Sequence, residues 1–371
     1  MREISLSVTP GVRPPRAWLY LIPVVAVLIC LGSLGISSIA NAAPGDPVCE
    51  ITPRPPVGVP APFDGVCEYL SGREGVKQAA IFDNRTDQTY LLSTGDAIQY
   101  TASIAKVDVL AKWLNGYQRR GVKIPDGIPY SIRYLMGRMI QNSDNAATTG
   151  LFHFGGGCEA LTKFNRLIPM NDTKVGCESS SYYGWGNTQT TAADQLRLMK
   201  VYAYGATRTV LPGATRKSLR KCKRLKKQAK RRACVRRVSR KADRMARRPI
   251  LNQAAREYGL GLMRNVEPDQ RFGITCGPWG TTCDPPNWAT PDPEVTVSLK
   301  NGWKTLPTCT DPIPQCPWQV NSTGWVTGRG RDYALSVLTT GNPVGTGDTY
   351  GFSYGIETIQ GISKLVWSNL G

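Results

Sequence analysis

The stretch Tyr100-Thr-Ala-Ser-Ile-Ala-Lys-Val-Asp-Val109 lies where a polar segment gives way to an apolar, periodic one. From Ser103 onward, apolar residues recur at the spacing of an amphipathic helix, which predicts a buried helix opening at this serine. Lys106 follows one helical turn later, on the same face, where its amine could act as a base for the serine hydroxyl. A helix cap followed by an ordinary surface lysine has the same spacing, because Ser is favoured at helix starts and Lys within helices.

The elements predicted around this stretch indicate an α+β fold. A hairpin of strands comes first, helices fill the middle, and strands with a last helix end the chain, so both ends are expected to share one sheet packed by helices. Thr191-Ala-Ala-Asp194 resembles a capping box at one helix start. The other predicted helices cover 132–140, 144–152 and about 349–370, and the predicted strands cover 79–83, 89–92, 294–299, 324–327 and 333–340.

The N-terminal region has the pattern of an export signal. Three arginines precede an uncharged run over 18–36, and Ala40-Asn41-Ala42 offers the small-x-small pattern read by a signal peptidase. We therefore expect a signal peptide over 1–42, and a membrane anchor over 18–36 is the competing interpretation, since that run is long enough to span a bilayer. Both predict a secreted or extracytoplasmic protein. The Pro-rich residues 43–73 are expected to form an extended lead-in.

The cysteines predict disulfides rather than a metal site. One of the eleven, Cys30, lies in the apolar run, and the other ten fall in neighbouring couples. An even number in an exported chain favours disulfides. With a single histidine, His153, expected in a loop, and no C-x-x-C, the usual zinc spacings are missing, so no metal or cofactor is expected. The expected pairs are Cys49 with Cys67, Cys158 with Cys177, Cys222 with Cys234, Cys276 with Cys283, and Cys309 with Cys316.

The formal net charge of +19 is concentrated in one segment. Residues 216–248 hold 18 Lys or Arg and a single acid, Asp243, while the mature remainder is charge-balanced. Such a run is usually a solvated, self-repelling helix or arm. Its functional partner in an exported protein would be an anionic cell-surface polymer or membrane, so no nucleic acid is expected. The protein is expected to be a monomer.

Two further motifs lie at informative places. Ser143-Asp144-Asn145 falls between two predicted helices, and Lys300-Asn301-Gly302 ends a predicted strand. With Ser103-x-x-Lys106 they follow the order S-x-x-K, S-D-N, K-x-G of the active-site serine enzymes. Over 74–371, with 216–248 as an insertion, the chain resembles the class A β-lactamase-like serine hydrolases of the β-lactamase and penicillin-binding protein superfamily. The resemblance implies a three-layer α/β/α fold.

The resemblance also implies roles for these residues. Ser103 would form an acyl-enzyme and Lys106 would be its base, which requires a neutral amine; burial and the nearby cation of Lys300 favour that form. Ser143 would pass a proton to the departing nitrogen. The implied substrate contacts are Asn145 to an amide, Lys300 and Asn301 to a carboxylate, and the backbone N–H groups of Ser103 and of Trp303, the residue after Gly302, to the oxyanion.

Three features depart from the class A pattern. The connection between the first two motifs is shorter, and Asn301 replaces the usual Thr or Ser. The E-x-x-L-N motif that positions the deacylating water is absent, and Glu178 is the one acid near its expected place. Glu178 is therefore a candidate deacylating base, or else an exposed acid on a loop tied down by Cys177.

The predicted function is that of an exported serine hydrolase acting on β-lactams or related acyl-peptides, such as a cell-wall stem peptide. One alternative is a slow-deacylating enzyme of the penicillin-binding or peptidase type. Another is a non-catalytic protein that binds anionic surfaces through 216–248. The intact catalytic motifs favour an enzyme, since a retired site is free to lose them.

Overall fold

The structure, a computed structural model, describes most of the chain beyond Asp46. The described residues are 49–55, 61–177, 183–206, 212–246, 248–280, 290–306, 309, 316–345 and 350–371, and they belong to one compact unit that begins at Pro47. The predicted signal peptide or anchor lies outside them. Among the described residues, no helix combines the length and the apolar character that a membrane span needs.

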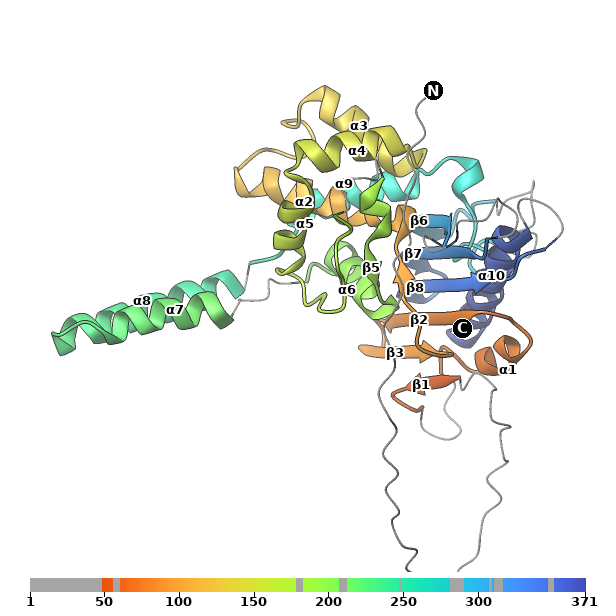
Figure 1. The fold of residues 1–371 in the computed structure, drawn as a ribbon, viewed down its shortest axis with the longest axis horizontal. Coiled ribbons are helices and arrows are strands. Elements are labelled where there is room, and N and C mark those ends of the chain that lie inside the picture. The colour runs from red at the N-terminus through yellow and green to blue at the C-terminus, as the bar shows by residue number, and fades with distance from the viewer. Residues whose placement is uncertain are drawn as a thin grey trace, which may run out of the picture. The chain divides into compact units, whose positions relative to one another are not determined.

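A six-stranded antiparallel sheet joins the two ends of the chain (Figure 1). Its order is β1-β3-β2-β8-β7-β6, so the N-terminal β2 pairs with the C-terminal β8 from Val76 opposite Thr340 to Asp83 opposite Tyr333. This confirms the prediction that both ends share one sheet. The strands are β1 Glu50–Thr52, β2 Val76–Asp83, β3 Gln88–Ser93, β6 Val295–Thr305, β7 Trp318–Gly328 and β8 Arg331–Asn342; β4 Gln99–Tyr100 and β5 Gln189–Thr190 form a separate pair.

Helices cover both faces of the sheet because its central strands are apolar on both sides. In β8, Leu335 and Val337 belong to the core shared with α10, whereas Ala334 and Leu338 belong to the core under the other helices. The fold is therefore α+β with helices on either side of the sheet, as predicted. The helices are α1 Val66–Ser71, α2 Ala105–Arg119, α3 Tyr130–Gln141, α4 Asn145–Phe154, α5 Gly157–Asn165, α6 Ala192–Ala203, α7 Pro212–Lys223, α8 Gln228–Ala246, α9 Gln253–Arg264 and α10 Tyr350–Asn369, with 3-10 turns η1 Ala102–Ile104, η2 Gly184–Asn187 and η3 Pro268–Gln270.

One predicted helix start is confirmed, and two other local predictions are wrong. The Thr191 hydroxyl accepts the Asp194 N–H at 3.2 Å, so α6 begins at the predicted cap. The expected lead-in over 43–73 instead contains β1 and α1, because α1 buries Val66 and Leu70 in the core with α10. His153, expected in a loop, is an exposed residue in the last turn of α4.

The basic segment forms a helical hairpin. Figure 1 shows α7 and α8 side by side and antiparallel, and the Cys222–Cys234 disulfide joins them. Ile250 N–H donates to the carbonyl oxygen of Ala206 at 3.1 Å, so the chain leaves the domain and returns to it at adjacent points. Three other predicted disulfides are present, and Cys283, the expected partner of Cys276, lies outside the described residues. These three are Cys49–Cys67, Cys158–Cys177 and Cys309–Cys316.

Candidate active site

Ser103 lies in the 3-10 turn η1, immediately before α2. The helix begins at Ala105 rather than at the serine, and no side chain caps the N-terminus of η1 or of α2. The helix-cap interpretation of Ser103 is therefore wrong. Ala102 has a φ of 46°, a left-handed conformation that L-residues other than Asn and Asp adopt at a cost.

The segment that leads into Ser103 is held from two sides. Asn321 of β7 donates its Nδ2 hydrogens to the carbonyl oxygens of Tyr100 and Thr101, at 2.7 and 3.2 Å. On the other side, Thr101 N–H donates to the carbonyl oxygen of Thr188 at 2.8 Å. The sequence carries no signal for Asn321, because its role depends on a contact 220 residues away along the chain.

β6 is the edge strand of the sheet and lies directly against η1. At Gly302 a Cβ atom would come within 2.7 Å of the backbone nitrogens of both Ser103 and Ile104. Only glycine permits this approach, which explains the last position of the K-x-G motif. Trp303 follows at the same edge, where an edge strand presents unpaired backbone groups.

The Lys106 amine lies at the centre of a polar cluster. Its Nζ is 2.6 Å from the Ser143 carbonyl oxygen, 2.8 Å from Asn145 Oδ1 and 3.0 Å from Ser143 Oγ. A neutral amine has two N–H donors and one lone pair. The two carbonyl oxygens match the two donors, so the lone pair remains free to accept a proton from a hydroxyl.

Burial makes that neutral form accessible near neutral pH. The Lys106 side chain is fully buried, and desolvation, aided by the charge of Lys300, lowers the pKa of Lys106 to about 6, although Asp144 opposes the shift. Desolvation lowers the pKa of Lys300 to about 7, with Asp269 acting in the opposite direction. Two ordinary lysines have thus become groups that exchange protons in the physiological range.

Ser143 bridges the two amines. Its Oγ lies 3.0 Å from Lys106 Nζ and 2.9 Å from Lys300 Nζ. Its φ of 56° is left-handed, and the next residue, Asp144, caps α4 by accepting the Ala147 N–H at 2.9 Å. Capping is therefore not the role of Ser143, and its hydroxyl is placed to relay protons between the two lysines.

Asn301 was expected to contact a substrate carboxylate beside the cluster, but its side chain points elsewhere. Its side chain is buried, and Nδ2 donates to the carbonyl oxygens of Gln270 and Phe272 at 2.8 and 3.1 Å. Both donors are therefore occupied, and this conformation leaves none for a substrate carboxylate. The amide at this position ties β6 to the end of η3 and to the residue Phe272 that follows it.

An indole ring covers the other side of Lys106. The Trp185 ring lies with its centroid 5.0 Å from Lys106 Nζ, and Trp185 Nε1 donates to Thr149 Oγ1 at 3.1 Å. No motif in the sequence points to this buried side chain. Glu178, the candidate deacylating base, lies outside the described residues. Within the described part of the chain, no cluster of three or more His, Cys, Asp or Glu residues could hold a metal ion.

Comparison with known proteins assigns most of the chain to a family. Residues 115–370 match the model of the beta-lactamase enzyme family, a span that begins after Ser103 and Lys106. A structure of PBP-A is 17% identical with a TM-score of 0.53, and the match covers 83% of this chain and 94% of that one. A class A beta-lactamase from Bacteroides cellulosilyticus DSM 14838 is 14% identical, with a TM-score of 0.55 and coverage of 83% and 96%.

A class A beta-lactamase from Mycobacterium abscessus is 14% identical with a TM-score of 0.52, and the match covers 82% of this chain and 98% of that one. At these identities the structural likeness establishes the fold alone. No curated protein sequence matches the chain.

Proposed function

Because the chain belongs to the beta-lactamase enzyme family, we propose that it is an exported serine hydrolase that forms an acyl-enzyme on Ser103. Its substrates would be β-lactams or related acyl-peptides. The observation that carries the proposal is the pair of buried, pKa-lowered amines, Lys106 and Lys300, on either side of the Ser143 hydroxyl. A surface lysine behind a helix cap would have none of these features.

The positions of Lys106, Ser143 and Lys300 support the following reaction. Lys106 Nζ takes the Ser103 proton while Oγ attacks the amide carbonyl carbon, and the N–H groups of Ser103 and Trp303 receive the oxyanion. The proton then passes from Lys106 through Ser143 to the leaving nitrogen as the C–N bond breaks. A substrate carboxylate beside Lys300 would raise the pKa of that amine and keep it charged. The remaining amide hydrogens of Asn145, an exposed residue, are available to a substrate carbonyl.

Release of the acyl group is the step with the least support. The E-x-x-L-N pattern is absent, and the buried indole of Trp185 occupies one side of Lys106. An apolar ring excludes water from that side. Acylation is therefore expected to be faster than deacylation, as in a slow-deacylating penicillin-binding enzyme, with Glu178 as the candidate base for the second step.

The test is to incubate the mature protein with a fluorescent penicillin and to measure its intact mass over time. A persistent adduct is expected, with a formation rate that rises with pH through about 6 as Lys106 loses its proton. Ser103→Ala should abolish the adduct, and Lys106→Ala should slow its formation by about a hundredfold or more. Lys112→Ala, on the same helix but outside the cluster, is the matched control and should change little.

The decay of the adduct decides between the two enzyme types. If Glu178→Gln slows the decay sharply, the protein behaves as a β-lactamase. Unchanged decay makes it a penicillin-binding type. If the wild type forms no adduct with penicillins, cephalosporins or acyl-peptide esters, the catalytic proposal is wrong.

We also propose a binding function for the helical hairpin of α7 and α8, as the site for an anionic cell-surface polymer. In its described part, Cys222 is the one buried residue, so the basic side chains are turned to solvent along both helices. A single acid, Asp243, offsets them. A polyanion would relieve this self-repulsion and release counterions, so the affinity should fall steeply with salt.

A further inference from the structure

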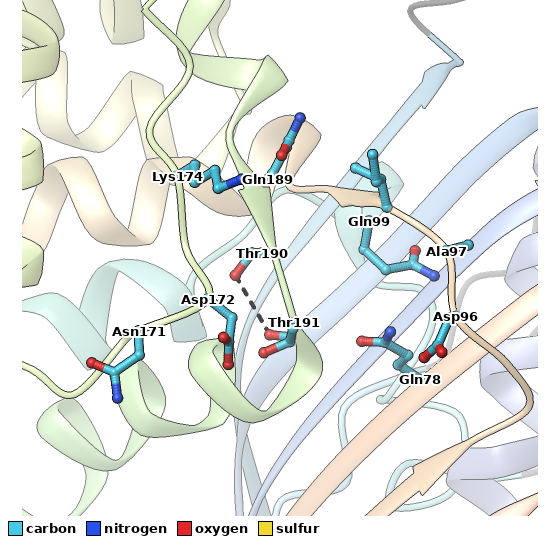
Figure 2. A pocket seen from close by; sticks show the side chains of 11 residues that line it. Gln78, Asp96, Ala97, Gln99, Asn171, Asp172, Lys174, Gln189, Thr190 and Thr191 are labelled. Carbon is cyan, nitrogen blue, oxygen red and sulfur yellow. Dashed lines mark hydrogen bonds between the residues drawn. The ribbon is translucent and has the colours of Figure 1, made fainter.

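An open cavity of about 510 Å³ lies beside the two-stranded sheet of β4 and β5 (Figure 2). None of the catalytic side chains lines it. Nine of its eleven lining residues have polar side chains, and its size is in the range of small-molecule sites. The lining residues are Gln78, Asp96, Ala97, Ile98, Gln99, Asn171, Asp172, Lys174, Gln189, Thr190 and Thr191.

Gln99 is the side chain that points to a ligand. It is 1% exposed, and neither its Oε1 nor its Nε2 has a hydrogen-bond partner among the described residues. Figure 2 shows its amide directed toward Asp96 and Gln78, opposite Asp172 and Thr191. A buried amide without partners destabilises a fold, and a native protein that keeps one calls for an explanation.

The charged groups around Gln99 are accessible to a ligand. Asp96, Asp172 and Lys174 are exposed, Gln189 is half-buried, and all four line the cavity. Two carboxylates with one amine do not favour a polyanion, and the lining holds no aromatic ring for a flat ligand to stack on. Hydroxyl groups, which both donate and accept, match this mixture of amides, carboxylates and amine.

A second cavity extends the first. It has a volume of about 380 Å³, shares Gln78, Asp172 and Thr191 with it, and continues along β3 toward Glu50. A ligand of several linked units would fit this arrangement better than a single small one. A hydroxyl-rich chain of linked rings is an oligosaccharide.

We propose that this cavity binds an oligosaccharide, with the Gln99 amide as its central hydrogen-bonding group. The cavity is joined to the active site through β4 and β5, since Gln99 pairs with Thr190 and lies four residues before Ser103. The link to the substrate rests on the proposed function. If Ser103 is acylated by an acyl-peptide, that peptide would belong to a glycopeptide whose sugar occupies the cavity.

The experiment titrates chitotriose and maltotriose, an N-acetylated and a plain glucose trimer, into the mature Ser103→Ala protein by calorimetry. Saturable binding of either sugar is expected, and Gln99→Leu should weaken it at least tenfold. Gln253→Leu, a substitution of an exposed glutamine on α9, is the matched control and should bind as well as its parent. If Gln99→Leu does not fold, Gln189→Leu tests the same cavity from the partly exposed β5.

Absence of saturable binding by both sugars overturns the proposal, and so does equal binding by the folded cavity variant. These outcomes are independent of catalysis, because the protein titrated lacks the nucleophile. Sugar binding without an acyl adduct on wild-type Ser103 would count against the proposed hydrolase alone. An adduct without sugar binding would count against the saccharide site alone.

Discussion

Asp108 lies two residues after Lys106 on α2, and burial raises its pKa whereas burial lowers the pKa of Lys106. It is fully buried, and it accepts Asn165 Nδ2 at 2.7 Å through Oδ2. The Oδ1 atoms of both side chains are buried without a partner among the described residues. We infer that Asp108 carries a proton on Oδ1, which gives this buried oxygen a hydrogen to donate; donation to Asn165 Oδ1 would close an acid–amide pair.

The stability of the protein should therefore depend on the protonation of Asp108. Burial raises the pKa of Asp108 from 3.8 to about 7, so the folded state holds this proton more tightly than the unfolded chain. The contribution of protonated Asp108 to the free energy of unfolding is fully present below about pH 4. This contribution, about 4 kcal/mol at most, is lost as the pH rises toward 7. Asp108→Asn, which keeps an amide pair with Asn165, should remove this contribution.

Urea unfolding of the wild type and of Asp108→Asn at a series of pH values measures the effect. The free energy of unfolding of the variant minus that of the wild type should rise between pH 4 and 7 and then level off. Taking the difference cancels the lysines, which titrate alike in both proteins. A difference that does not change with pH would mean that Asp108 is charged in the fold.

At the scale of residues, the sequence predicts the site residues that belong to a known motif. It misses those whose position depends on contacts between distant parts of the chain. The structure brings Lys106, Ser143, Asn145 and Lys300 together, as their motif positions imply. Trp185 has no such signal, because its place over Lys106 depends on how η2 packs. The direction of a side chain at a strand end, as at Asn301, likewise depends on the loop behind it.

At the scale of elements, the approach of β6 to η1 is the contact on which the proposed oxyanion site depends. Gly302→Ala would place a methyl group 2.7 Å from Ser103 N, a separation that real Cβ atoms do not show, so β6 or η1 must shift. Displacements of this kind lower rates by about a hundredfold. The variant should fold and keep its sheet, since β6 is an edge strand, but acylate slowly.

Gly261→Ala is the control for this variant. Gly261 lies within α9, where an added methyl group would meet open space, so alanine there should preserve activity and add up to about 1 kcal/mol of stability. Stopped-flow acylation with a chromogenic cephalosporin and thermal unfolding compare the two variants. An unchanged acylation rate in Gly302→Ala would show that the oxyanion site does not depend on this contact.

Periodicity predicts long elements better than short ones. The apolar spacing of α2 and α10 and the long buried run of β8 are strong signals, because each helix buries a whole face and β8 is buried on both faces. α1 is six residues long and follows a Pro-rich segment, so its sequence contains too little periodicity to reveal it. It forms because tertiary burial and the Cys49–Cys67 disulfide stabilise it.

At the scale of the whole molecule, the helical hairpin should be separable from the enzyme. Its ends meet where Ile250 N–H donates to the Ala206 carbonyl oxygen, so a short Gly-Ser linker in place of 216–248 can span the gap. Acylation of Ser103 should be unchanged in this variant. Salt-sensitive binding to polyphosphate should be lost, with neutral phosphatidylcholine vesicles and anionic phosphatidylglycerol vesicles as comparison surfaces.

Two outcomes would contradict this division. Failure of the deletion variant to fold would mean that the hairpin is part of the core. Retention of polyphosphate binding would place the anionic site elsewhere on the molecule. Loss of binding together with intact acylation supports two functions on one chain.

The pairing of β2 with β8 also determines the order in which the parts of the molecule can fold. The described disulfides close loops of 7 to 19 residues and can form while the chain is still emerging. The contact between Ser143 and Lys300 spans 157 residues, and the central strands cannot pair until β8 is available. Contacts this distant make folding slow. The proposed nucleophile therefore meets its full set of partners only after synthesis of the last strand, and acylation of Ser103 would report that this strand is in place.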